Sequence, residues 1–437
     1  SAKIEKQIKK TSFPKQTYLI TDFGAKPDTP DAPCHEAINQ AIVTCCLNGG
    51  GTVVVPKGTF YTGPITLKSN VNFHVEEGAV LKFSTDQSLY FPGVITRWEG
   101  IDCYNAHPLI YAYGETNIAI TGKGTIDGQG SNETWWPMCG APRYGWKEGM
   151  VAQRNGGRER LLMYGETSTP IYKRVMTPED GLRPQLINLY SCNTVLIEDV
   201  TLLNSPFWVI HPLFCESLTV RGVYVYNRGP NGDGCDPESC KNVLIENCTF
   251  DTGDDCIAIK SGRNQDGRKW GVPSENIIVR GCYMKKGHGG VVIGSEISGG
   301  YRNLYVENCK MDSPDLDRVI RIKTSTCRGG IIENVFVRNI TVGQCREAVL
   351  RINLQYENRE QCNRGFTPTV RNVHLKNVTC QKSRLGVLII GLDDDQHVYN
   401  ISVEDSHFNN VAKGGNDIKG AHDVTLKNLY INGELVK

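Results

Sequence analysis

The sequence of 437 residues lacks a Pro- or Ser-rich linker, a run of like charge and an apolar segment long enough to span a membrane. Lysine and arginine (48) nearly equal aspartate and glutamate (47), so the net charge is +1 and no basic stripe marks a nucleic-acid binder. An even composition without linkers favours one elongated domain. We therefore expect a soluble protein that neither binds nucleic acid nor inserts into a membrane.

The chain opens on Ser1 rather than methionine, and no signal peptide is expected in its polar first residues. A missing leader does not place a protein in the cytosol, since leaders are removed on export. Residues 1–17 are polar and predict a helical lead-in to the main domain, residues 18–437.

One helix is expected near the start, where apolar residues from His35 to Leu47 follow a helical spacing and the glycines at 49–51 end it. Beyond this helix only short, strand-like segments follow, separated by turn residues. The chain is therefore expected to be all-β apart from a short helix that caps one end.

A repeat emerges from about residue 116 onward. Equivalent aliphatic positions recur at steps that begin with 23 residues, from Ile197 to Val220, and reach 38 residues, from Val337 to Leu375. A strand-like repeat of this length with variable insertions is typical of a β-solenoid in which each unit forms one coil. The positions taken as equivalent are Ile197, Val220, Ile245, Val279, Val306, Val337, Leu375, Val403 and Leu426.

The 17 cysteines cannot all pair, because their number is odd. Cys248, Cys282 and Cys309 stand three residues after repeat positions, at a site that other coils fill with Val, Ile or Leu. Coils about 4.8 Å apart are close enough for a disulfide, which leaves the pairing open. A site that also accepts aliphatic residues favours free, buried cysteines that act as small hydrophobes.

A long insertion at residues 131–185 interrupts the repeat and is rich in Trp, Arg and Tyr. One interpretation is a loop that only covers the side of the solenoid. The other is a wall of a carbohydrate cleft, because aromatic faces stack on sugar rings and Arg binds carboxylates.

Three acidic residues, Asp233, Asp254 and Asp255, lie in Gly-rich surroundings on either side of a short apolar segment. Asp233 and Asp254 are 21 residues apart, which places them on neighbouring rungs of a solenoid. Like charges this close should raise at least one pKa and produce a proton donor. Taken alone, the Asp254–Asp255 pair is more typical of a solvated turn.

Later coils extend this acidic group with His288 and then with Arg321 and Lys323. Strand alternation sends Arg321 and Lys323 to one face and Ile322 to the other. An acid and a base can cleave a glycosidic bond, and two cations beside them can bind the carboxylate of the sugar. This combination indicates hydrolysis of a uronic-acid glycoside. Taken alone, His288 would be interpreted as a structural loop residue. The hypothesis of a catalytic site therefore depends on the order in which these residues follow one another on consecutive coils.

Four further charged residues lie near the acids in the sequence. Asp236 and Glu238 are expected to cap the turn before the next strand. Lys260 and Arg263 follow that strand and line a neighbouring subsite or lie on the solvated surface.

The motifs NGD at 231–233, GDD at 253–255, GHG at 287–289 and RIK at 321–323 resemble the motif set of the polygalacturonases, glycoside hydrolase family 28. The resemblance covers nearly the whole chain from about residue 18. It also includes FGAKPD at 23–28, GGGTVVVPKGTFYTGPITLKSNV at 49–71 and GTIDGQGSNETWW at 124–136. It implies a single-domain right-handed parallel β-helix that hydrolyses α-1,4-galacturonosyl bonds with inversion and needs neither a metal nor another cofactor.

By this resemblance Asp254 is the general acid, and Asp233 and Asp255 activate the attacking water. An inverting pair should then stand roughly 6.5–9.5 Å apart. His288 would tune the protonation of the acid. The chain departs from the family at Gly232, where members commonly have Thr.

The resemblance further assigns Arg321 and Lys323 to the substrate carboxylate. Tyr356 is the candidate for a substrate-binding tyrosine, and Lys260 is a second candidate contact. The substrate would be pectic polysaccharide or an oligogalacturonide, handled by a monomer outside the cytoplasm, in a periplasm or secreted to act on plant cell walls.

The insertion at 131–185 and the widened coils at 263–275 and 354–368 suggest a cleft closed at one end. This favours exo-acting release of galacturonic acid. The alternatives are an endo-polygalacturonase, a rhamnogalacturonan hydrolase, a Ca²⁺-dependent pectate lyase and a non-catalytic carbohydrate-binding solenoid.

Overall fold

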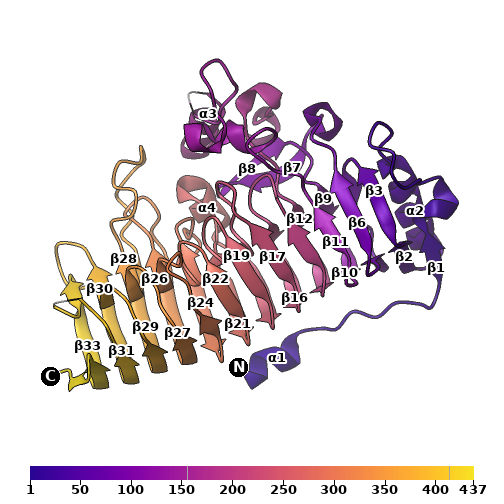
Figure 1. The fold of residues 1–437 in the computed structure, drawn as a ribbon. Helices are drawn as coiled ribbons and strands as arrows, with labels where there is room; N and C mark the ends of the chain where they lie inside the picture. The colour runs from indigo at the N-terminus through magenta and orange to yellow at the C-terminus, as the bar shows by residue number, and fades with distance from the viewer. Residues whose placement is uncertain (155, 413) are drawn as a thin grey trace.

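The protein is a right-handed parallel β-helix, seen in a computed structural model that describes residues 1–154, 156–412 and 414–437. Its coils stack along one axis from the N-terminal to the C-terminal end (Figure 1). Each coil contributes strands to three parallel ladders, so the expected solenoid is confirmed. The long strands near the C-terminus run through both the first and the second ladder.

The strands of each ladder follow the order of the chain. The first ladder consists of β1 (Thr17–Leu19), β2 (Gly51–Val55), β5 (Val71–Val75), β10 (Thr116–Thr121), β13 (Asn193–Glu198), β16 (Glu216–Arg221), β18 (Lys241–Glu246), β21 (Ser274–Arg280), β24 (Tyr301–Glu307), β27 (Ile331–Val342), β29 (Thr369–Cys380), β31 (Val398–Phe408) and β33 (His422–Ile431). The second consists of β3 (Gly58–Thr62), β6 (Ala79–Phe83), β11 (Thr125–Asp127), β14 (Thr201–Leu203), β17 (Tyr224–Asn227), β19 (Thr249–Thr252), β22 (Tyr283–Lys286) and β25 (Lys310–Met311).

The third ladder has two parts joined by single bridges at Cys235, which pairs with Ile210 and with Ile257. Before the joint lie β4 (Ile65–Thr66), β9 (Ile110–Tyr113), β12 (Ile187–Tyr190) and β15 (Ile210–Leu213). After it lie β20 (Ile257–Ile259), β23 (Val291–Gly294), β26 (Arg318–Lys323), β28 (Ala348–Asn353), β30 (Leu385–Ile390) and β32 (Asp417–Lys419). The antiparallel pair β7 (Val94–Trp98) and β8 (Ile101–Asn105) projects as a hairpin, and β34 (Glu434–Leu435) pairs with β33.

The repeat positions identified in the sequence are confirmed as partners in the first ladder. Ile197 pairs with Val220, Val220 with Ile245, and the pairing continues in unbroken succession to Leu426. From Ile197 to Val403 these side chains are at most 1% exposed, so one apolar column runs through the core. Burial of such a column is the main force that stacks the coils.

A ladder of asparagines marks the turn at the start of the first-ladder strands. Each amide nitrogen donates to the side-chain oxygen of the asparagine one coil earlier, at 2.6–3.1 Å. All six residues have φ between 56° and 68°, a left-handed conformation that Asn tolerates better than most residues. The ladder comprises Asn242, Asn276, Asn303, Asn334, Asn372 and Asn400.

The helices lie outside the ladders. The predicted helix is confirmed as α2 (His35–Leu47), which lies at the N-terminal end of the solenoid (Figure 1). The lead-in is helical only in α1 (Ala2–Gln7), whose Ile4 packs on Leu244 and Ile278 of the flank. In the insertion lies α3 (Gly157–Glu166), close to α4 (Asn264–Trp270). Short 3₁₀ helices occupy Ile20–Phe23, Gln87–Tyr90, Trp136–Cys139, Pro142–Tyr144, Ile171–Lys173 and Pro178–Asp180.

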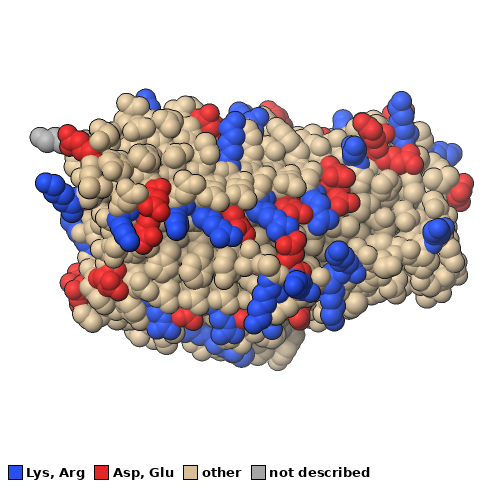
Figure 2. All heavy atoms as spheres, turned by 90° about the horizontal axis from the view of Figure 1, so that it is seen from below, with Lys and Arg blue, Asp and Glu red and all other residues tan. Residues whose placement is uncertain are grey.

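Charged side chains alternate in sign on the outer surface. Arg221 Nε lies 2.6 Å from Glu246 Oε1, and Arg280 Nε lies 2.8 Å from Glu246 Oε2. On the face shown in Figure 2, Lys and Arg lie among Asp and Glu rather than in a patch of one sign. None of the described helices is both long and apolar enough to pass through a membrane.

Most cysteines are free, as expected. Cys248, Cys282 and Cys309 are buried in the core without a disulfide. One disulfide joins Cys327 to Cys362 and thereby fastens the loop that follows β28.

We expect titration of the denatured, unreduced protein to find fifteen free thiols, and titration after reduction to find 17, because one disulfide accounts for two of the cysteines. The measurement is a thiol-reagent assay under both conditions. Markedly fewer free thiols before reduction would show that cysteines of neighbouring coils pair.

Candidate active site

The three aspartates lie in the turns that lead from the second ladder to the third. Asp233 follows β17, whereas Asp254 and Asp255 lie between β19 and β20, one coil later. The coils are held in register by backbone hydrogen bonds, since Gly234 N donates to Asp255 O at 3.1 Å and His288 N donates to Asp254 O at 3.0 Å. The site is therefore built from equivalent turns of consecutive coils.

Carboxylate oxygens of the three aspartates all lie within 4.8 Å of one another. The expected spacing of 6.5–9.5 Å is therefore not found between the nearest oxygens. The reason is geometric: Asp254 and Asp255 are adjacent in sequence, and stacked coils are only about 4.8 Å apart. The site is a compact cluster rather than two facing carboxylates.

The three aspartates differ in their tendency to hold a proton. Burial raises the pKa of Asp233 well above its usual value, and the charges of Asp236, Asp254 and Asp255 raise it further. This agrees with the expectation that crowding makes one of the acids hold a proton.

His288 stabilises the ionised form of Asp254, with Nδ1 3.2 Å from Asp254 Oδ1. Burial opposes ionisation of Asp254, but the hydrogen bond and charge of His288, with the charges of Lys323 and Arg321, lower its pKa. The hydrogen bond with Asp254 in turn raises the pKa of His288 against the effect of burial. In the free protein the proton of this pair therefore resides on the imidazole.

Arg321 and Lys323 point to the same face of β26, while Ile322 is fully buried in the core, as strand alternation predicted. Both cations contact Asp255: Arg321 Nη1 lies 3.1 Å from Oδ1 and Lys323 Nζ lies 2.8 Å from Oδ2. Burial opposes ionisation of Asp255, but these charges lower its pKa. Arg321 Nε is buried with no hydrogen-bond partner among the described residues.

The structure brings both candidate substrate contacts to the site. The ring centroid of Tyr356 lies 5.0 Å from Lys323 Nζ and 5.6 Å from Arg321 Cζ. Lys260 Nζ donates to Gly294 O at 2.9 Å and lies 4.9 Å from the ring centroid of Trp208. Lys260 and Arg263 are each 2% exposed, so the interpretation of either as a solvated surface residue is wrong.

Glu238 and Asp236, the two acids expected to cap a turn, differ in their hydrogen-bond partners. Glu238 is structural, since it accepts from Gly262 N at 2.9 Å and contacts His211 Nε2 at 2.8 Å. Asp236 is not a cap, because no backbone N–H among the described residues donates to its buried carboxylate. Its hydrogen-bond partner is the protonated carboxyl group of Asp233. Burial raises the pKa of Asp236 to about 8, against the opposing charge of Lys260.

A cavity of about 320 Å³ lies over Asp233, Asp254 and Lys323. Its wall includes Gln153 and Arg154 of the insertion at 131–185. The insertion is therefore a wall of the cavity rather than a remote cover. Such a pocket, lined mainly by polar groups, is suited to a charged sugar.

Arg183, which sequence reasoning missed, ties this wall to the acids. It is fully buried, and Nη2 donates to Gln153 Oε1 at 3.1 Å and to Asn231 Oδ1 at 2.6 Å. Asn231 opens the motif that carries Asp233, so Arg183 fixes both sides of the cavity. Nothing in the segment GLRPQL distinguishes this arginine in the sequence.

The departure at Gly232 has a local cause. A Cβ at this position would lie 2.7 Å from Gly229 O and 2.8 Å from Asn227 O. The turn before Asp233 is thus packed too tightly here for the threonine that family members commonly have.

The same three carboxylates are the described side chains grouped closely enough to hold a metal ion. Asp255 already contacts two protein cations, and Asp254 contacts His288. Protein groups therefore balance much of the acidic charge, an arrangement that favours acid and base catalysis over cation binding.

The sequence profile of Glycosyl hydrolases family 28 matches residues 177–390. The chain is 32% identical over 333 residues to a Vitis vinifera protein named "Probable polygalacturonase", and 28% identical over 399 residues to exo-poly-alpha-D-galacturonosidase of Dickeya chrysanthemi. These alignments cover 74% and 85% of this chain but only 60% and 63% of those relatives' lengths.

Solved structures are similar over nearly the whole chain. A hyperthermoactive exopolygalacturonase from Thermotoga maritima is 40% identical with a TM-score of 0.95, and the match covers 100% of this chain and 96% of that one. A family 28 exopolygalacturonase from Yersinia enterocolitica shares the fold, at 24% identity and a TM-score of 0.69, over 97% of this chain and 80% of that one.

We expect Asp236→Asn to stabilise the protein increasingly as the pH rises. The folded-state pKa of about 8 lies above the unfolded value of about 3.9, so the folded protein keeps a proton that the unfolded chain releases. The stability of the wild type therefore falls between about pH 4 and pH 8. Asn does not titrate and escapes this penalty.

The measurement is the melting temperature of both proteins across this pH range. The advantage of the variant should grow from the acidic to the neutral end. A difference that is constant with pH would contradict a buried, protonated Asp236.

Proposed function

This chain belongs to family 28 of the glycosyl hydrolases, and from that premise we propose that it hydrolyses α-1,4-galacturonosyl bonds from a chain end, releasing galacturonic acid. The substrate is homogalacturonan or an oligogalacturonide. The observation that carries the proposal is a cavity lined by Asp233, Asp254 and Lys323. Directly beside these residues lie Asp255, His288 and Arg321, contributed by consecutive coils. A relative of 40% identity and matching length is an exopolygalacturonase.

In the proposed mechanism the carboxylate of the substrate takes over contacts of Arg321 and Lys323, both now engaged by Asp255. Arg binds carboxylates well through its planar fork of donors. This exchange releases Asp255 to face the reacting water. Tyr356, close to both cations, borders the same subsite.

Asp254 acts as the general acid and receives its proton from His288. As the bond between C1 and the glycosidic oxygen breaks, Asp254 protonates the leaving oxygen, and the oxygen of water bonds to C1. The proton of water passes to Asp255, which the site keeps ionised, while Asp233 holds the water. The resemblance to the family implies inversion, although the carboxylates lie closer than in most inverting pairs.

We also propose an extracytoplasmic place of action. The disulfide between Cys327 and Cys362 supports it, because disulfides persist in oxidising compartments and are rare in the cytosol.

We expect a polygalacturonate digest to yield monomeric galacturonate as the first product, in the β-anomeric form if the reaction inverts. Asp254→Asn should lower kcat by about 10²–10⁴-fold, because general acid catalysis contributes about that much. The measurements are size-resolved product analysis, ¹H NMR of the initial anomer and steady-state kinetics.

The matched control is Asp199→Asn, the same change on the outer surface, which should leave turnover unchanged. Intermediate-length oligomers at early times would refute exo action. Ca²⁺-dependent ultraviolet absorbance of an unsaturated product would indicate a lyase, and unchanged turnover in Asp254→Asn would overturn the catalytic assignment.

A further inference from the structure

A cluster of four charged side chains, Glu99, Arg158, Arg263 and Glu357, stands at one side of the active-site cavity. Arg158 Nε lies 2.9 Å from Glu99 Oε2, and Arg263 Nη1 lies 3.4 Å from the same oxygen. Arg263 Nη2 lies 3.5 Å from Glu357 Oε2. We call these four residues the wall cluster.

Each member of the wall cluster comes from a different addition to the basic coil. Glu99 lies in the turn of the β7–β8 hairpin, Arg158 lies in α3, and Arg263 lies directly before α4. Glu357 lies in the loop after β28. Four segments that are far apart in the sequence thus converge at one place beside the acids.

The wall cluster separates two cavities. All four members line the cavity of about 320 Å³ that contains Asp233 and Asp254. Arg158, Arg263 and Glu357 also line a second cavity of about 1000 Å³, which extends along α3. The same side chains therefore form the partition between the acids and a larger space beyond.

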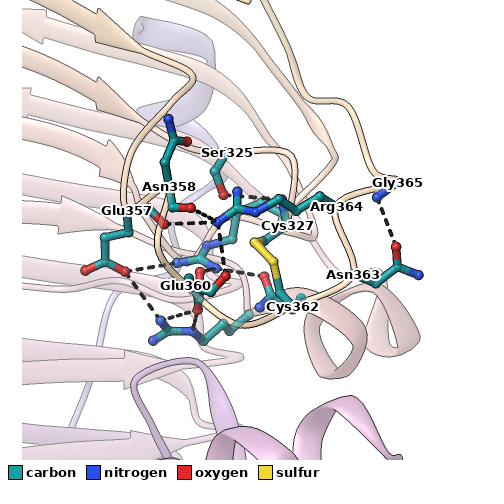
Figure 3. Close-up of a disulfide and its surroundings, with 12 residues drawn as sticks. Ser325, Cys327, Glu357, Asn358, Glu360, Cys362, Asn363, Arg364 and Gly365 are labelled. Atoms are coloured by element: carbon teal, nitrogen blue, oxygen red, sulfur yellow. Dashed lines mark hydrogen bonds and ion pairs between the residues drawn. A yellow bond between two sulfur atoms is a disulfide. The ribbon is translucent and has the colours of Figure 1, made fainter.

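The partition is firmly anchored behind its surface. Arg263 Nε donates to Glu360 Oε1 at 2.7 Å, and Arg328 Nη1 donates to Glu360 Oε2 at 2.6 Å. The disulfide between Cys327 and Cys362 fastens the same loop (Figure 3). Side chains held by buried ion pairs and a covalent link cannot move aside without breaking these contacts.

Arg364 braces the loop from within. Its Nη2 donates to the carbonyl oxygens of Asn358 at 2.6 Å and Glu360 at 3.0 Å (Figure 3). The backbone that carries Glu357 is therefore fixed at both ends of this short segment.

We infer that the wall cluster is the stop that ends the substrate cleft and limits each cut to one terminal sugar. The inference rests on the proposed function and names the residues that set its exo mode. A bound chain meets the wall after the sugar held over Asp233 and Asp254. Arg158 and Glu357 are two of the side chains that line both cavities, so their removal would widen the passage from the cleft into the larger cavity, which has space for further sugar units.

The test is the double variant Arg158→Ala/Glu357→Ala. These side chains are 28% and 40% exposed, whereas the buried anchors Arg263 and Glu360 are left intact, so the fold should be retained. Release of one terminal sugar from hexagalacturonide leaves a pentasaccharide, so disaccharide is the diagnostic product. We expect early digests by the variant to contain disaccharide, with its ratio to monomer raised about tenfold or more, as the loss of a specific contact allows.

The matched control is Met163→Ala. Met163 is 54% exposed and lines the larger cavity but not the active-site cavity. This variant should still release monomer first, with the kinetics of the wild type.

The outcomes separate this inference from the proposed function. No galacturonate from the wild type would refute the proposed function itself. Early digests that contain monomer and pentasaccharide but no disaccharide, from both the wild type and a folded double variant, would refute only the wall. If melting curves show that the double variant is unfolded, Arg158→Ala alone decides, with the same rise in disaccharide expected and its absence contradicting the inference.

Discussion

The separation of about 4.8 Å between stacked coils is the constraint on which the site depends. It brings residues that are 21 or more positions apart in the sequence into direct contact, because equivalent turns of neighbouring coils lie above one another. It also forces three aspartates within 4.8 Å of one another. The site must therefore distribute protons and cations so that this concentration of negative charge is tolerated.

The distribution is asymmetric, and the asymmetry is what makes the cluster chemically useful. His288 keeps Asp254 ionised, Arg321 and Lys323 keep Asp255 ionised, and Asp233 retains a proton. Each cation reaches the acids from a later coil. An anionic substrate that competes for Arg321 and Lys323 would change this balance at the moment of binding, which couples recognition to catalysis.

The solenoid and the members of the site were predictable because the repeat is visible in the coils from about residue 116 onward. Ile197 to Leu426 form one column in the structure in the order that the sequence indicates. The opposite facing of Arg321 and Ile322 follows from the period of two in a strand. The lead-in was less predictable, since only Ala2–Gln7 is helical.

Contacts between insertions could not be predicted in the same way. Glu99 and Arg263 are 164 residues apart, lie outside the repeat and belong to segments of unrelated length, so no periodicity relates them. The same holds for the β7–β8 hairpin and for the pairing of Cys327 with Cys362. The expected cap role of Asp236 was wrong because the burial of its side chain next to Asp233, away from any backbone donor of the turn, leaves no mark in the sequence.

A crystal structure of Asp254→Asn with trigalacturonate tests the central claim most directly. The account predicts that a sugar carboxylate contacts Arg321 and Lys323, with the scissile bond over the substituted side chain at position 254 and the terminal sugar against Glu99 and Arg158. A chain that passes the wall cluster into the larger cavity, or that binds away from the three acidic positions, would contradict it.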